Sequence, residues 1–91
     1  MLAVLAYDIA SPKRLQAIAK TCKDFGVRIQ KSIFECHLDP PRFDSLWEKL
    51  SAIVVPEEDS LVAYQINAAD AQRTRTLGRM ERSEQAVSYV Y

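Results

Sequence analysis

The first nine residues constrain the fold of this chain more than any other segment, because they form an unbroken apolar run that closes on a single acid. Residues 1–9 read MLAVLAYDI. A run of this length is too short for a helix unit and suits a buried strand. Ser11 and Pro12 follow at once and are typical of a helix N-cap and a first helical residue. The chain is therefore predicted to open with a strand, a turn and a helix.

Apolar residues at helical spacing extend this first helix toward Gly26, which we expect to close it in a left-handed C-cap. The stripe consists of Leu15, Ile18, Ala19, Cys22 and Phe25. Residues 27–38 then alternate at period two, as strands do. Twelve residues are long for one strand, so two short strands folded at residues 30–32 are expected, although neither Gly nor Asn marks the turn.

A second helix is predicted to begin at Asp39, where two prolines follow an N-cap residue. Its apolar positions fit the helical period and comprise Phe43, Leu46, Trp47, Leu50, Ile53 and Val54. Pro56 and the acidic residues 57–59 end the helix in a turn, and residues 61–66 read as a further strand. Residues 67–85 are polar and predict a loop or a loosely helical stretch, and residues 86–91 are typical of a last short strand.

The predicted order is β-α-β-β-α-β with a trailing strand, which indicates an α+β, ferredoxin-like sandwich with both helices on one face of an antiparallel sheet. Residues 1–91 are expected to form one domain, with a core over residues 1–66 and a polar loop and C-terminal strand over residues 67–91. A strand beyond a long polar loop can pair with the sheet edge of a neighbouring chain. We therefore expect a homodimer built partly in this way.

Charge is balanced over the whole chain but not along it. Lys and Arg total 12 and Asp and Glu total 12, so the formal net charge is zero. Residues 1–38 nevertheless carry six basic residues against three acidic ones, residues 39–70 two against seven, and residues 71–91 four against two. One interpretation is solvated polar helix faces. The other is a basic surface, formed by the first helix, the second strand and the tail, that follows a phosphate backbone.

No apolar stretch approaches the roughly 20 residues of a membrane span, so no membrane association is expected. The N-terminus lacks the basic start of a signal peptide. Cys22 and Cys36 are therefore expected to be reduced core thiols in a cytoplasmic protein.

Asp8 is the first candidate functional residue, because it is the only acid among the first 23 residues and ends the apolar strand. Two roles are open for it: a capping partner for the helix that follows, or a functional carboxylate at the end of the sheet. One carboxylate is a poor magnesium site, but a dimer that paired two Asp8 side chains would provide two. A Mg²⁺ ion held there could polarise a phosphodiester and orient water for hydrolysis.

Other chemistry is disfavoured. Cys22, Cys36 and His37 do not have a recognised zinc spacing and lack a fourth ligand. Gly26 and Gly78 are the only glycines, so a glycine-rich phosphate loop is excluded.

Three segments together resemble the CRISPR-associated protein two family, the small partner of the CRISPR integrase. The first is Tyr7-Asp8-Ile9 with Arg14 and Gly26, the second is residues 30–35, reading QKSIFE, and the third is residues 59–61, reading DSL. The resemblance covers residues 1–66 in order, and the tail matches only in being polar and ending in a short strand.

The resemblance implies a ferredoxin-like homodimer that pairs through sheet faces, with the last strand joining the partner's sheet, and a break at residues 30–32. It implies a metal-dependent endonuclease acting on RNA or DNA, and a structural subunit that binds DNA beside the integrase during spacer acquisition. Asp8 matches the catalytic, metal-binding aspartate, with one Mg²⁺ shared between two copies. The positions matching residues implicated in activity or nucleic-acid contact are Tyr7, Arg14, Arg28, Ser32 and Phe34, with a turn-forming role also open for Ser32.

Two alternatives remain open. The chain could be a non-catalytic, nucleic-acid-binding assembly module on the same fold. It could also be a toxin-type endoribonuclease, because a small toxin ribonuclease family has a similar scaffold and aspartate.

Overall fold

A computed structural model describes residues 1–79 of the chain. The elements, in chain order, are β1 (Leu2–Asp8), α1 (Pro12–Lys23), β2 (Val27–Gln30), β3 (Ile33–His37), α2 (Pro40–Ile53), β4 (Ser60–Ile66) and the short α3 (Ala68–Gln72). The predicted order and the break between β2 and β3 are both confirmed. The strand expected at residues 86–91 lies outside the described residues.

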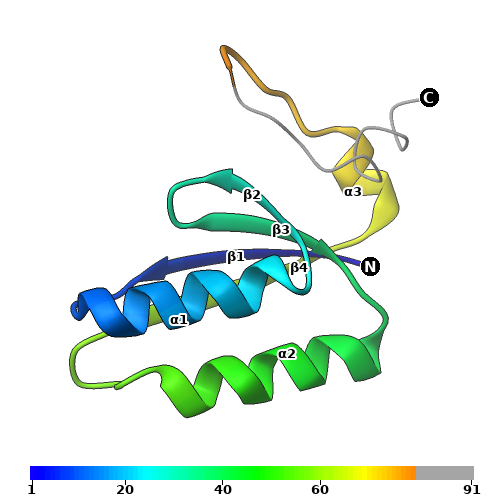
Figure 1. The fold of residues 1–91 in the computed structure, drawn as a ribbon. Helices are drawn as coiled ribbons and strands as arrows, with labels where there is room; N and C mark the ends of the chain where they lie inside the picture. Colours follow the sequence, from blue (N-terminus) through cyan, green and yellow to red (C-terminus); the bar gives the residue numbers. More distant parts are fainter. Residues whose placement is uncertain (80–91) are drawn as a thin grey trace.

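The four strands form one antiparallel sheet in the order β2-β3-β1-β4. Figure 1 shows α1 and α2 side by side on one face of this sheet, as the ferredoxin-like prediction requires. The long strands β1 and β4 pair along their whole length, from Leu2 opposite Ile66 to Asp8 opposite Ser60. The carboxyl end of β1 therefore lies beside the start of β4. No helix within residues 1–79 is both long and apolar enough to cross a membrane.

Both helices begin at the predicted caps. The Ser11 side chain accepts a hydrogen bond from the Arg14 backbone N–H at 3.3 Å, and Asp39 does the same for Arg42 at 3.0 Å. Each cap is followed by proline in the first turn, where a missing N–H has no cost.

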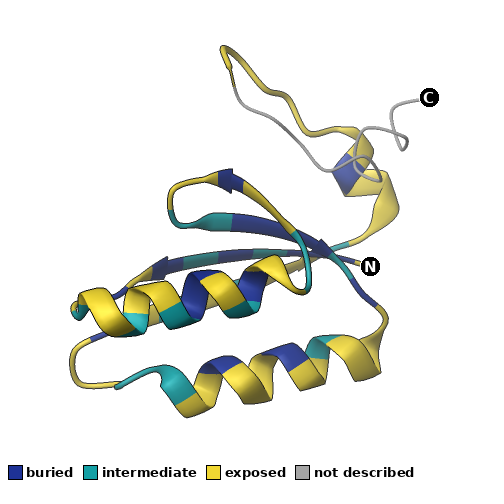
Figure 2. Ribbon diagram, in the orientation of Figure 1, coloured by how far each residue is buried: buried dark blue, intermediate teal, exposed yellow. Residues whose placement is uncertain are grey.

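The core lies between the sheet and the two helices, whose buried residues face the sheet while their outer faces are exposed (Figure 2). Its fully buried side chains include Leu5, Phe34, Ile18, Leu46 and Leu50. The second helix differs from the prediction at Trp47, which remains 38% exposed because Leu46 and Leu50 occupy the buried stripe.

Gly26 follows the end of α1, but the predicted left-handed cap is wrong. Gly78 is the only residue with positive φ among those described, so Gly26 is needed for space and not for its backbone angles. A Cβ at this position would come within 2.3 Å of the Glu35 carbonyl oxygen and 2.4 Å of the Cys36 sulfur. The close approach of the chain to β3 therefore excludes any side chain here.

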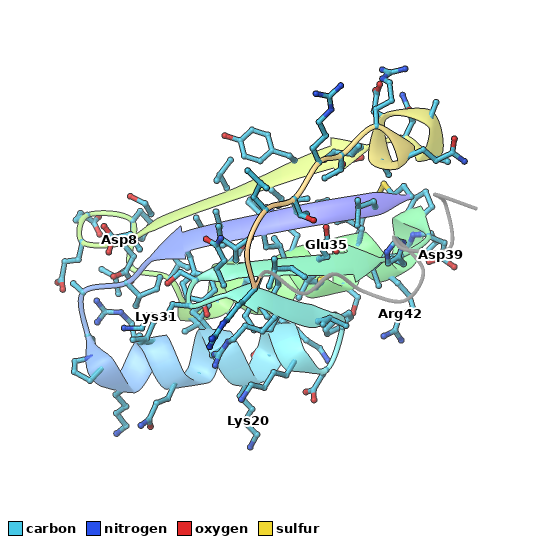
Figure 3. The ribbon with its side chains drawn as sticks, turned by 90° about the horizontal axis from the view of Figure 1, so that it is seen from above. Asp8, Lys20, Lys31, Glu35, Asp39 and Arg42 are labelled. Carbon is cyan, nitrogen blue, oxygen red and sulfur yellow. The ribbon has the colours of Figure 1, made fainter. Side chains whose placement is uncertain are left out.

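The face of the sheet away from α1 and α2 is also rich in apolar residues. We call it the helix-free face because α1 and α2 do not cover it, although the short α3 lies at one end of it (Figure 1). Because side chains alternate along a strand, it carries the residues of β1 and β4 that do not point into the core. Val62 and Tyr64 on β4 are 38% and 59% exposed. Figure 3 views this face and shows Glu35 near its middle, and Glu35 is itself buried.

Candidate active site

Asp8 is the last residue of β1 and is exposed at one end of the sheet (Figure 3). Tyr7 before it is buried on the helix side, so strand alternation directs Asp8 to the helix-free face. Among residues 1–79, the Asp8 side chain has no hydrogen-bond or ion-pair partner. It lies in a shallow hollow of about 310 Å³ that β1 and β4 line together.

The turn between β2 and β3 lies at the same end of the sheet. The Tyr7 backbone N–H donates to the Ser32 carbonyl oxygen at 3.1 Å, and the Tyr7 hydroxyl donates to the Lys31 carbonyl oxygen at 3.5 Å. The structure therefore places Ser32 near Tyr7 and Asp8, and the Ser32 carbonyl oxygen binds the turn to β1. The roles of its hydroxyl and of Tyr7 toward a nucleic acid stay predictions.

Tyr7, Phe34 and Arg28 form a stacked group on the helix side of this region. The Tyr7 and Phe34 ring centroids are 6.3 Å apart, and the Arg28 guanidinium carbon lies 5.3 Å from the Phe34 centroid. Burial raises the pKa of Tyr7, against a hydrogen bond from Arg28 that lowers it. Phe34 is 0% exposed, Tyr7 is 6% exposed and Arg28 is exposed, so of the three only Arg28 offers its side chain to solvent.

Asp59 lies at the same end of the sheet, and sequence reasoning placed it in a turn and in the family match at residues 59–61 without giving it a role. Its Oδ1 atom accepts hydrogen bonds from the Ala10 N–H at 2.9 Å and from Arg14 Nη2 at 3.0 Å. Its Oδ2 atom accepts from Arg14 Nε and from the Val55 N–H, each at 2.9 Å. The side chain is 0% exposed, so Asp59 is a buried carboxylate with four donors.

These hydrogen bonds change the expectation for Arg14. The guanidinium is engaged with Asp59 and, through Nη2, with Glu58 Oε1 at 3.1 Å, and its side chain is 23% exposed. The hydrogen bond from Arg14, helped by the Val55 and Ala10 N–H groups, holds the pKa of Asp59 well below its usual value. Asp59 and Glu58 in turn raise the pKa of Arg14. Direct contact between Arg14 and phosphate stays a prediction, in competition with two carboxylates.

The only sequence signals for the Asp59 site are the match at residues 59–61 and the acid just before a strand. Neither indicates a partner 45 residues away on α1.

The two cysteines are core residues. Both are 0% exposed, and burial raises the pKa of Cys22 to about 11 and that of Cys36 to about 12. A neutral buried thiol is a poor metal ligand.

A hard divalent cation would find one suitable side chain here. Residues 1–79 contain no group of three or more His, Cys, Asp or Glu side chains arranged to hold a metal. Asp8 is an exposed carboxylate without a competing donor, and carboxylate oxygen is the ligand that Mg²⁺ prefers. The residue therefore fits a Mg²⁺ ion that takes its other ligands from water, from phosphate oxygens or from a second copy of the chain.

The fold and this end of the sheet define a small α+β protein of the ferredoxin-like class, with a free carboxylate at the end of its first strand. A family model described as CRISPR associated protein Cas2 matches residues 1–74. The chain belongs to this family.

Named relatives agree. The chain is 38% identical over 78 residues to a protein of Chloroflexus aurantiacus named CRISPR-associated endoribonuclease Cas2 3, covering 86% of this chain and 84% of that protein. It is 42% identical over 69 residues to CRISPR-associated endoribonuclease Cas2 of Chlorobaculum tepidum, covering 70% and 72%. A relative from Halalkalibacterium halodurans, 37% identical over 71 residues and covering 72% and 74%, is named an endonuclease.

Solved structures agree as well. The crystal structure of Streptococcus pyogenes Cas2 at pH 6.5 matches with a TM-score of 0.76 and 35% identity, covering 86% of this chain and all of that one. A hypothetical protein of Thermus thermophilus, TT1823, matches with a TM-score of 0.79 and 28% identity, covering 91% and 96%. The predicted family and fold class are both confirmed.

Proposed function

We propose that this protein is a metal-dependent endonuclease that hydrolyses phosphodiester bonds in RNA or DNA and acts in CRISPR adaptation. Nuclease activity is supported by the names of its relatives, which call them endoribonucleases or endonucleases. In spacer acquisition, the chain would serve as a cytoplasmic, DNA-binding structural subunit beside the CRISPR integrase.

The observation that carries the proposal is the free Asp8 carboxylate. Sequence alone left a capping role open, but Ser11 caps α1 and Asp59 binds the Ala10 N–H of the turn between β1 and α1. With both structural positions filled by other residues, Asp8 is left exposed at the end of a buried strand. A carboxylate with no structural partner among residues 1–79 is available to a cation or a substrate.

The site needs a second copy of the chain, because one chain offers one carboxylate. The helix-free face has exposed apolar side chains, among them Val62 and Tyr64, and Asp8 lies at its border. Pairing two such faces would bury apolar surface and bring two Asp8 side chains toward each other. A shared Mg²⁺ would relieve their repulsion, and when bound it would supply Lewis-acid polarisation of the phosphodiester.

Arg28 is the residue best placed to hold the nucleic-acid backbone. It is exposed, it lies over the Phe34 ring, and no acidic partner restrains it within the described residues. The Phe34 ring that Arg28 contacts is itself stacked against the ring of Tyr7.

The test is Asp8→Asn, which removes the charge and keeps the shape. Cleavage in Mg²⁺ should be lost while nucleic-acid binding and melting temperature stay close to those of the parent. A variant that cleaves like the parent contradicts the proposal.

A non-catalytic assembly module is the second candidate, favoured by the single carboxylate in each chain. Under that function the parent protein would bind nucleic acid and the integrase, show no cleavage in Mg²⁺, and be unaffected by Asp8→Asn. The toxin-type endoribonuclease is separated by genomic context, because an adjacent integrase gene and repeat array support adaptation and a lone antitoxin gene does not.

A further inference from the structure

The buried ion pair between Asp59 and Arg14 lies next to Asp8, and its geometry indicates more than fold stability. We propose that Asp59, clamped by Arg14, is a positioning residue that fixes the turn behind Asp8. Arg14 then acts on cleavage through this turn and not by holding phosphate. The inference rests on the function proposed above and adds to it how the carboxylate is held in place.

Asp59 links its own turn to the turn after β1 and the start of α1, which lie 45 to 49 residues away in the sequence. Its four hydrogen bonds connect the turn after β1 (Ala10), the first turn of α1 (Arg14) and the turn that follows α2 (Val55). The carboxylate is 0% exposed, so water does not replace a donor that is lost.

The position of Asp8 is tied to Asp59 from two directions. Ala10, two residues after Asp8, donates its N–H to Asp59, and Ser60, directly after Asp59, pairs with Asp8 across the β1–β4 ladder. Asp8 itself has no side-chain bond within residues 1–79 to hold it. Its location therefore depends on the backbone around it. Because a displacement of about 1 Å can cost about 100-fold in rate, this support matters for cleavage.

The Arg14 guanidinium is poorly placed to bind a phosphate group. Its Nε and Nη2 atoms already donate to Asp59 and Glu58, and two carboxylates neutralise its charge. A phosphate held by Nε or Nη2 would have to displace the ion pair with Asp59, which leaves Asp59 uncompensated. Lys13, the neighbouring residue, is an exposed cation on the same helix and provides a matched control.

Arg14→Gln and Lys13→Gln each remove one positive charge, from adjacent positions. Three quantities separate the roles: the slope of nucleic-acid affinity against salt without metal, Mn²⁺-induced broadening of the Asp8 and Ala10 amide signals in nuclear magnetic resonance, and the rate of cleavage. The probe for the site is Mn²⁺ alone.

For Arg14→Gln we expect an unchanged salt slope, a Mn²⁺ concentration for half-maximal broadening raised about tenfold, and cleavage reduced about tenfold or more. Lys13→Gln should leave the Mn²⁺ titration unchanged. Asp59→Asn should repeat the Arg14→Gln result, and the double variant should be no worse than the worse single variant, because the two residues act as one unit.

General destabilisation is controlled by Leu46→Ala, which creates a core cavity at a residue of α2 nine positions before Val55. It should lower the melting temperature without moving the Mn²⁺ titration. If Arg14→Gln does not fold, Arg14→Lys keeps the charge and should give an intermediate Mn²⁺ shift.

The inference is overturned if Arg14→Gln lowers the salt slope by about one and leaves the Mn²⁺ titration unchanged. It is also overturned if Asp59→Asn titrates like the parent. A parent protein with neither Mn²⁺ broadening nor cleavage contradicts the proposed function itself, which is a different result.

Discussion

Two aspartates lie at the same end of the sheet and have opposite surroundings. Asp8 ends β1, is exposed, and has no side-chain partner within residues 1–79. Asp59 precedes β4, is fully enclosed and accepts four hydrogen bonds. The same functional group therefore serves two purposes. A carboxylate whose donors are all supplied by the protein holds the fold, and a carboxylate without donors is available to a ligand.

The strongest test of this contrast is the effect of Asp8→Asn on cleavage compared with its effect on stability. Under the proposed function, losing the charge assigned to the metal should reduce the cleavage rate by about 100-fold or more. The free energy of unfolding should change by less than about 0.5 kcal/mol, because an exposed residue without partners contributes little. Cleavage assays in Mg²⁺ and urea unfolding measure the two effects. A large loss of stability would show that Asp8 has a structural role after all.

The proposed function also requires a second copy of the chain to complete the site at Asp8. Val62→Asp puts an unpaired charge on the helix-free face and should raise the dimer dissociation constant at least about tenfold. Cleavage should fall in parallel at low protein concentration. Leu15→Asp on α1 is a matched control, since Leu15 and Val62 are both 38% exposed. Analytical ultracentrifugation that finds the same change for both variants, or none, would contradict pairing through this face.

Arg28 and Arg14 extend the comparison to cations. Arg28 is exposed above an aromatic ring, whereas Arg14 is engaged by two acids. Arg28→Ala should weaken nucleic-acid binding by about fivefold and lower the salt slope by about one. Fluorescence anisotropy across a salt series measures both values. An unchanged slope would show that Arg28 does not contact phosphate.

The contribution of Asp59 to stability should depend on pH. The pKa of Asp59 is lowered in the folded protein from its ordinary 3.8, so on acidification the unfolded state takes up the proton first. Its contribution to stability is fully present above about pH 5 and is lost as the pH falls through about 4 and below. Asp59→Asn should be less stable at pH 7 and should lose less stability between pH 5 and pH 3. Urea unfolding over this range that gives parallel curves would contradict the assignment.

Much of the fold could be predicted because its signals are local. Ser11 and Asp39 cap helices through contacts three residues away, and period-two and helical spacing identify the strands and helices. The residues give only weak support for the break at residues 30–32, because neither Gly nor Asn marks the turn. The family resemblance implies the break directly. Asp8 stands out in the residues as the only acid among the first 23, the resemblance matches it to the metal-binding aspartate, and its side chain has no partner within residues 1–79.

The misses concern residues whose role depends on distant segments. Gly26 was expected to provide a left-handed backbone, yet it is required by the approach of β3. Trp47 matched the helical stripe but is 38% exposed, because the stripe is wider than the core it meets. Arg14 matched a position implicated in nucleic-acid contact, and nothing in the sequence indicated its ion pair with Asp59.

The sequence by itself determined the order of elements, the helix caps, the family and the aspartate at the end of the first strand, because each is carried by neighbouring residues or by motifs of a few residues. Only the tertiary structure decided which charges are enclosed and which are free. That outcome depends on the β1–β4 pairing that places Ser60 opposite Asp8 and on the contact between residues 14 and 59. The sheet brings together residues that are more than 40 positions apart in the sequence. Burial then gives the carboxylates of two aspartates different chemistry.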